Sequence, residues 1–295
     1  MNKRTTRGDR IFQWCINIIA ILICVVTVYP LIYVVSASFS EPIKLMSGDV
    51  VLWPVGLNVN SYRRVFASAD IINGYKNTII YATSGTLLNL VLTIFAAYPL
   101  SMPDMKGKNF VTFMITFTMF FSGGMIPSYL NIRSLGLLDS VGAVLLPGAI
   151  NATNMLIMRN FFTHSVPGEL REAASIDGCS PLRTMLNIIL PLSKSILIVI
   201  TLYYFVGHWN SYFDAMMYLR KKDMMPLQVL LRQILLMSQM GDMAETYGVD
   251  DANTLLLYES LKYAIIVISA VPLLIIYPLI QKFFEKGIMM GSIKG

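Results

Sequence analysis

The chain has 295 residues, of which 55% are hydrophobic and only 14% are charged, and its formal net charge is +6. Soluble domains carry about 25% charged residues, so a chain this apolar, with a mean hydropathy of +0.62, must expose much of its surface to lipid. The basic residues form no dense patch with aromatic side chains between them, which argues against nucleic-acid binding. The cysteines and histidines show neither a pairing pattern nor metal-ligand spacing, so we expect no metal site.

Six apolar segments are long enough to cross a hydrocarbon core of about 30 Å as helices. The sequence therefore predicts an all-α membrane protein with six transmembrane helices. Several of the spans contain proline, which bends a helix but is tolerated where neighbouring helices satisfy the freed backbone groups. The predicted spans are Ile11–Val35, Gly74–Leu100, Phe110–Leu130, Ser140–Phe162, Ser195–Phe213 and Leu261–Phe284.

The first span follows a basic N-terminus, residues 1–10. A secretory signal peptide starts in the same way, but an apolar run of about 25 residues exceeds the usual signal core. If the N-terminus is inside, the inner segments hold more Lys and Arg than the longer outer segments, in agreement with the positive-inside rule. We therefore expect both termini in the cytoplasm, together with the segment between the fourth and fifth spans.

Two long loops are expected outside the cell, over residues 36–73 and 214–260. The second contains "PLQVLLRQILL", whose leucine and isoleucine residues share one helical face and predict an amphipathic helix. The acidic stretch that follows, "GDMAETYGVDDANT", is either a solvated loop or a docking surface for an external partner.

The chain lacks the motifs of a catalytic or self-energised protein. It has no P-loop, no H-E-x-x-H and no G-x-S-x-G sequence. The predicted spans are nearly free of charge, and His208 and Asp214 lie only near the outer end of the fifth, which disfavours an ion-coupled carrier. We expect no enzyme activity in this chain, so any energy source must lie on another chain.

The charged segment between the fourth and fifth spans, residues 164–191, carries helix start and stop signals. Pro167 suits the first turn of a helix, Gly178 is a left-handed stop, and Ser180 with Pro181 begins a second helix. The segment is predicted to be a cytoplasmic knob that offers Ala174 and Ile176 to a hydrophobic socket and Glu172 to a basic partner. Its second helix is predicted to carry an apolar stripe of Leu182, Met185, Leu186 and Ile189.

The same segment reads E-A-A, three residues, Gly, nine residues and I-x-L-P, which resembles without gap or shift the EAA loop of ABC-importer permease subunits. The stretches "NMLIMRNFFTHSVPGELREAA", "GHWNSYFDAMMYL" and "QKFFEKGIMMGSIKG" extend the resemblance over nearly the whole chain. They are similar to carbohydrate permeases on the side of the maltose-importer G subunit, in particular the LplC/YtcP-like branch. The resemblance implies the type I importer fold, with residues 11–284 as the transmembrane domain.

In this family the EAA loop is a coupling helix that sits in a cleft of a cytoplasmic ATPase. The resemblance implies that Glu172 pairs with a basic group of the ATPase and that Gly178 makes the turn. Closure of the ATPase dimer on ATP would then turn the permease from inward-facing to outward-facing. The implied coupling residues are Glu172, Ala173, Ala174, Asp177, Gly178, Leu190 and Pro191.

The last residues, 285–295, are expected to form a flexible cytoplasmic tail. The stretch "KGIMMGSIKG", Lys286–Gly295, resembles in length and character the tail that enters the ATPase dimer interface in the maltose-type relative. A frayed end is the alternative. The implied contacts are Lys286, Gly287, Gly291, Ser292 and Lys294.

The resemblance also implies partners: a second permease, two ATPase subunits that bind ATP and Mg, and an extracellular solute-binding lipoprotein, at a bacterial cytoplasmic membrane. The substrate would be a saccharide, in particular an oligosaccharide or polysaccharide fragment. Aromatic faces and hydrogen-bonding groups suit a sugar path, although an aromatic belt at the membrane interface explains some of them equally well. The candidates are Tyr203, Tyr204, Trp209, Asn210 and Tyr212.

Two other functions stay open at this point. A secondary carrier would take up its substrate along an ion gradient and would survive the loss of any ATPase. A membrane scaffold would recruit an ATPase without transporting anything.

Overall fold

The computed structural model describes residues 7–246 and 252–292. Every regular element within these residues is a helix, which confirms the predicted all-α class. The chain forms two compact units, one of Met1–Ala69 with Leu231–Ala270 and the other of Asp70–Leu230 with Val271–Gly295. Helices α14 (Leu227–Thr246) and α15 (Ala252–Ser292) therefore each contribute to both units.

The first unit is built on a long apolar helix. Three helices begin it in chain order: α1 (Arg7–Ser38), α2 (Pro42–Met46) and α3 (Asn60–Ala67). A small core of Ala37, Leu45 and Val50 closes the end of α1, and the Ser38 hydroxyl lies 2.7 Å from the Tyr62 hydroxyl. These contacts hold the first loop compactly beneath the helix.

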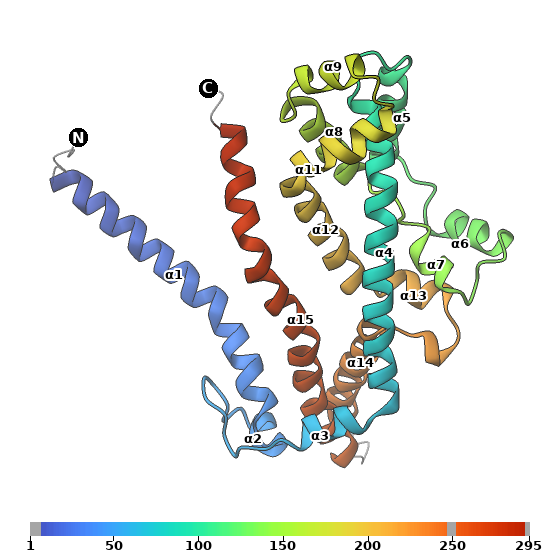
Figure 1. Ribbon diagram of the computed structural model, residues 1–295. Coiled ribbons are helices and arrows are strands. Elements are labelled where there is room, and N and C mark those ends of the chain that lie inside the picture. Colours follow the sequence, from blue (N-terminus) through green and yellow to red (C-terminus); the bar gives the residue numbers. More distant parts are fainter. Residues whose placement is uncertain (1–6, 247–251, 293–295) are drawn as a thin grey trace. The chain divides into compact units, whose positions relative to one another are not determined.

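The second unit contains the long helix α4 and a series of shorter helices (Figure 1). Its elements are α4 (Ala69–Ser101), α5 (Lys108–Phe120), α6 (Met125–Ser134), α7 (Val141–Leu145), α8 (Ala152–His164), α9 (Gly168–Ile176), α10 (Pro181–Thr184), the π-helix η1 (Met185–Ile189), α11 (Leu190–Leu192), α12 (Lys194–Trp209), α13 (Phe213–Tyr218) and the 3-10 turn η2 (Lys222–Met224).

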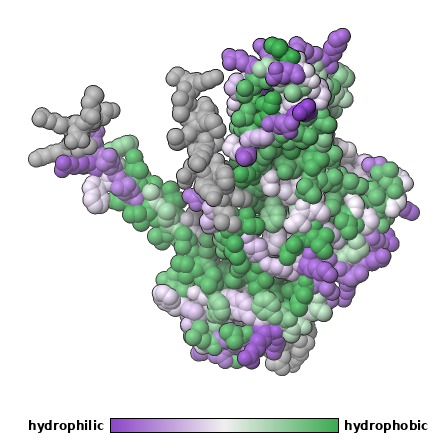
Figure 2. All heavy atoms as spheres, in the orientation of Figure 1, coloured by the Kyte–Doolittle hydropathy of each residue, from purple (hydrophilic) through white to green (hydrophobic). Residues whose placement is uncertain are grey.

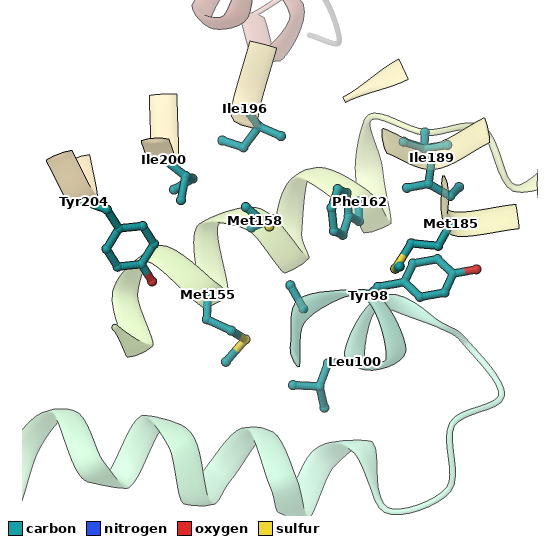
Figure 3. Packing of buried hydrophobic residues seen from close by; sticks show 12 residues of the cluster. Tyr98, Leu100, Met155, Met158, Phe162, Met185, Ile189, Ile196, Ile200 and Tyr204 are labelled. Atoms are coloured by element: carbon teal, nitrogen blue, oxygen red, sulfur yellow. The ribbon is translucent and has the colours of Figure 1, made fainter. Parts of the chain in front are cut away.

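The core of the second unit lies where α4, α8, η1 and α12 meet (Figure 3). Met155, Met158 and Phe162 project from α8 and are fully buried, as are Ile189 of η1 and Ile200 of α12. Methionine suits such a junction because its unbranched side chain fills irregular gaps between helices that meet at different angles. The core therefore joins the end of α4 to the segment that precedes α12.

Three helices in the described part of the chain are long and apolar enough to cross a membrane: Gly8–Ser38, Ala69–Ser101 and Leu261–Pro278. They coincide with the first, second and sixth predicted spans. Two bent helix pairs raise the number to five if each pair forms one span. The described helices thus supply three to five candidate spans, and six remains a prediction.

The third, fourth and fifth predicted spans are not single straight helices. A bend of 115° separates α5 from α6, and a bend of 86° separates Pro181–Leu192 from α12. The fourth span is divided between α7 and α8 by residues 146–151. Hydropathy did not reveal these breaks, because a few glycines and prolines hardly lower the mean hydropathy of an apolar segment. They nevertheless weaken or interrupt the helix.

The two expected features of the C-terminal part had different outcomes. The expected amphipathic helix is present as α14: Leu227 is buried, Arg232 and Gln233 are exposed, and the rest of the predicted apolar face is half-buried, namely Leu230, Leu231, Ile234 and Leu235. Residues 285–292 of the expected tail are helical, because α15 continues to Ser292, and the role of the tail stays a prediction. Glycine lowers helix stability by about 1 kcal/mol per residue but does not forbid the helix, so Gly287 and Gly291 can lie within it. Lys294, and residues 247–251 of the acidic stretch, lie outside the described residues.

Candidate functional site

The predicted segment 164–191 contains two short helices joined by a turn, α9 and α10, and we call residues 168–184 of it the knob. Helix α9 ends at a left-handed Gly178, whose φ is +72°. The amide of Cys179 donates to the Ala174 carbonyl at 2.9 Å and closes the helix end. Nothing lies within 4 Å of a Cβ built on Gly178, so the backbone conformation, and not lack of space, requires glycine here.

The second helix of the knob starts as its sequence signals predicted. The Ser180 side chain accepts a hydrogen bond from the Arg183 amide, and Pro181 occupies the first helical turn. Pro167 differs slightly from its prediction, because it is the N-cap of α9 and the helix begins at Gly168. The starts of α9 and α10 therefore agree with the sequence prediction to within one residue.

Helix α9 presents different faces to its surroundings. Ala174 is only 3% exposed and packs inside the chain, whereas Ile176 is 86% exposed. Ala173 and Asp177 are exposed beside it. The prediction that Ala174 is offered to an external socket is therefore wrong for this structure, since its small side chain lets α9 pack closely on the unit. Ile176 and Ala173 form the exposed apolar tip.

Arg171 fastens the knob to two other helices. Its guanidinium donates to the Ser101 carbonyl at 3.2 Å and to the Phe162 carbonyl. Arg159 adds a hydrogen bond from Nε to the Leu100 carbonyl at 3.0 Å. These cations lie at the C-terminal ends of α4 and α8, where free carbonyls and the helix dipole favour positive charge.

Sequence reasoning overlooked Arg171. Burial lowers its pKa from the usual value, an effect partly offset by Tyr98, but arginine keeps its proton in proteins. A buried cation therefore requires acceptors, and the helix ends supply them. The available signal was an arginine directly before Glu172 in a helix that is otherwise rich in alanine.

The predicted apolar stripe is only half correct. Met185 and Ile189 are buried, but Leu182 and Leu186 are 53% and 51% exposed. Residues 185–189 form a π-helix, whose wider turn changes which side chains share a face. Leu190 packs against the core while Pro191 is exposed, so the I-x-L-P residues mark the passage from η1 to α12.

The five candidate sugar-path residues separate into two groups. Tyr204 and Trp209 are buried, and Trp209 packs against Phe205 and Tyr75 with ring centroids 5.8 Å apart in each case. Tyr203 is 47% exposed, Asn210 is exposed and Tyr212 is half-buried. The buried pair belongs to the packing of α12 in this structure, and the other three reach the surface.

Polar side chains of α4 that sequence reasoning did not select contact α12. The Thr93 hydroxyl lies 2.6 Å from the Tyr204 hydroxyl, and the Asn89 amide nitrogen lies 3.1 Å from His208 Nε2. His208 is thus a packed polar residue within the unit. Nothing in the sequence distinguished these contacts, because they join residues more than 100 positions apart in the chain.

The family described as "Binding-protein-dependent transport system inner membrane component" matches residues 2–290. The chain belongs to this family. It is an inner-membrane transport component, and the expected permease class is confirmed. ATP hydrolysis in such systems is carried by a separate chain.

Individual relatives match this permease over nearly its whole length. The polygalacturonan/rhamnogalacturonan transport system permease protein YtcP of Bacillus subtilis (strain 168) is 39% identical and covers 97% of this chain and 99% of its own. Protein LplC of the same strain is 37% identical, and the match covers 98% of this chain and 97% of LplC. A crystal structure of a bacterial ABC transporter involved in alginate import contains a chain with a TM-score of 0.85 and 35% identity, covering 96% of this permease and 100% of that chain.

Proposed function

We propose that this permease is one of two membrane subunits of an ATP-driven importer for an oligosaccharide or polysaccharide fragment. The names of its relatives support the substrate class, since they refer to polygalacturonan, rhamnogalacturonan and alginate. A more distant relative, at 26% identity, transports arabinooligosaccharides by its name. The shared chemistry of these substrates is a chain of sugar units.

The observation that carries the coupling part of the proposal is the exposed tip of the knob. A large apolar side chain that is 86% exposed, Ile176, stands beside Ala173 and Glu172. Arg171 ties the helix beneath this tip to the ends of α4 and α8. A force on the tip would therefore reach two helices of the permease without passing through a flexible linker.

The partners in this proposal are those that membership of the family implies in general. A second permease completes the translocation path, and this chain itself crosses the membrane six times with both termini in the cytoplasm. Two ATPase subunits bind ATP and Mg and receive the two knobs, and the C-terminal end of α15 approaches the ATPase. A loaded extracellular binding protein delivers the saccharide to the outer loops, and Tyr203, Asn210 and Tyr212 line its path.

The coupling proposal is tested with the complete transporter in lipid vesicles, where uptake and ATP hydrolysis are measured together. The double variant Glu172→Lys, Ile176→Asp replaces the acidic and apolar contacts of the tip. We expect uptake to fall at least about tenfold, the loss produced by about 1.4 kcal/mol of contact energy. Leu135→Asp is the matched control, because Leu135 is an exposed apolar residue outside the knob.

Normal uptake by the double variant would refute the coupling role of the knob. Uptake that continues without ATP but follows an imposed ion gradient would instead establish a secondary carrier. An assembled complex that hydrolyses ATP but moves no saccharide, even with the binding protein present, would support the scaffold alternative.

A further inference from the structure

An open hollow of about 910 Å³ lies beside the knob in the second unit. Its walls come from the last turns of α4, the loop to α5, and the sides of α9 and α10 that do not carry the exposed tip. Ile176 and Ala173 are not among its lining residues, whereas Arg171 and Ser175 are. A volume of this size lies within the range of ligand sites, about 300–1,000 Å³.

Two polar atoms of residues that line the hollow lack a hydrogen-bond partner among the described residues. They are the Tyr98 hydroxyl and the Nε of Arg171, both of which are buried. Tyr98 itself is only 5% exposed, and its hydroxyl points away from the neighbouring core side chains (Figure 3). Leaving buried donors unpaired is costly, so the site is suited to a ligand with several acceptor oxygens.

A third donor faces the same space. Lys108 Nζ donates to the Met102 carbonyl at 3.3 Å, and an ammonium group has two further hydrogens to give. Lys108 and Arg171 are the cationic lining residues, and Asp104 and Glu172 are the acidic ones. This mixture favours a ligand that carries an anionic group together with hydrogen-bond donors.

The remaining walls are apolar. Phe95, Leu182 and Met185 line the hollow, and Phe95 and Leu182 are both 53% exposed. A free phosphate ion would leave these apolar side chains uncovered. An amphiphile would instead place hydrocarbon on them and offer headgroup hydroxyls to the carboxylates.

The position of the hollow fits such a ligand. Lys108 is the first residue of α5, an apolar helix none of whose residues is buried within the chain. Phe95 and Tyr98 belong to the final turns of α4, a candidate membrane span. Headgroups gather where apolar spans end, and basic side chains at such ends reach toward them.

We propose that this hollow binds the phosphodiester headgroup of a membrane phospholipid, with one acyl chain along Phe95 and Leu182. The phosphate oxygens accept from Lys108, Arg171 Nε and the Tyr98 hydroxyl, and a headgroup hydroxyl donates to Asp104. The inference uses the membrane location of the family and does not require that the knob couple to an ATPase. A bound lipid would stiffen the contact between the knob and the end of α4.

The test uses the complete detergent-solubilised transporter, to which dioleoyl phosphatidylglycerol or inorganic phosphate is added. Lipid binding is followed by native mass spectrometry and by the shift in thermal stability. We expect binding of the phospholipid but not of phosphate, and a loss of about tenfold in lipid affinity for Lys108→Gln. Tyr98→Phe should weaken binding to a smaller extent, since it removes only a hydroxyl without a hydrogen-bond partner in the described residues.

Lys106→Gln is the matched control, because Lys106 is exposed, lies two residues from Lys108 and does not line the hollow. An equal loss of lipid for Lys106→Gln and Lys108→Gln would overturn the proposal, as would equal stabilisation by inorganic phosphate. The proposal would also fail if Lys108→Gln weakened ATPase attachment and left lipid binding unchanged, since the hollow would then belong to the ATPase. Loss of uptake in Ile176→Asp alone, a residue that does not line the hollow, with lipid binding intact would leave this inference standing.

Discussion

Two long apolar helices of the permease, α1 and α4, have very different surroundings. None of the candidate span in α1 is buried within the chain, whereas a third of that in α4 is buried. Figure 2 shows hydrophobic side chains along α1, with hydrophilic ones near its N-terminal end. Hydropathy alone therefore identifies both as spans but does not distinguish a helix that packs on its own chain from one that faces lipid or another subunit.

The small and polar residues of α4 explain why it is more buried than α1. They recur every three or four positions and lie on its buried face, whereas the span of α1 is dominated by large branched side chains. Small residues let helices approach closely in a membrane, and hydroxyl and amide groups add hydrogen bonds between them. The buried set is Gly74, Thr78, Ala82, Gly85, Asn89, Thr93 and Ala97.

The largest effect is expected from a larger side chain at Gly85, where α4 lies against α12. A Cβ on Gly85 would lie 2.6 Å from Nε2 of His208, which is also held by Asn89. Gly85→Leu should therefore separate α4 from α12 and lower the free energy of unfolding by about 3 kcal/mol or more. The thermal unfolding temperature of the purified permease and its yield in the membrane fraction measure the effect.

The matched control for this change is Ala20→Leu on α1, where the residue is exposed. The same side chain is added to an apolar helix, but nothing in the chain opposes it. Equal destabilisation by the two variants would show that the small-residue face of α4 has no special role in packing.

A smaller effect is expected from the hydrogen bonds on the same face. Thr93 and Tyr204 hydroxyls are 2.6 Å apart and buried. A double-mutant cycle with Thr93→Val and Tyr204→Phe should give a coupling free energy of about 0.6 kcal/mol, a typical value for side-chain hydrogen bonds within a membrane protein. Additive effects of the two substitutions, measured by reversible unfolding in detergent, would mean that packing alone holds this face.

Sequence reasoning succeeded where a local rule determines the structure. The Gly178 stop and the Ser180 cap depend on neighbouring residues only, and both are found. It failed where distant residues decide, as for Arg171, whose acceptors lie on α4 and α8. The π-helix at 185–189 also escaped prediction, because an apolar pattern of this length fits an ordinary α-helix.

The smallest expected effect concerns α1 itself. Leu22 is 61% exposed, whereas Leu100 at the end of α4 is 3% exposed. Leu22→Ala should change the free energy of unfolding of the isolated permease by less than about 0.5 kcal/mol, since both residues favour helix and no protein contact is lost. Leu100→Ala, the same substitution in the core, should cost about 2–5 kcal/mol. Comparable losses in the two variants would mean that α1 packs on its own chain after all, while a loss for Leu22→Ala that appears only in the assembled transporter would assign the exposed face of α1 to a partner subunit.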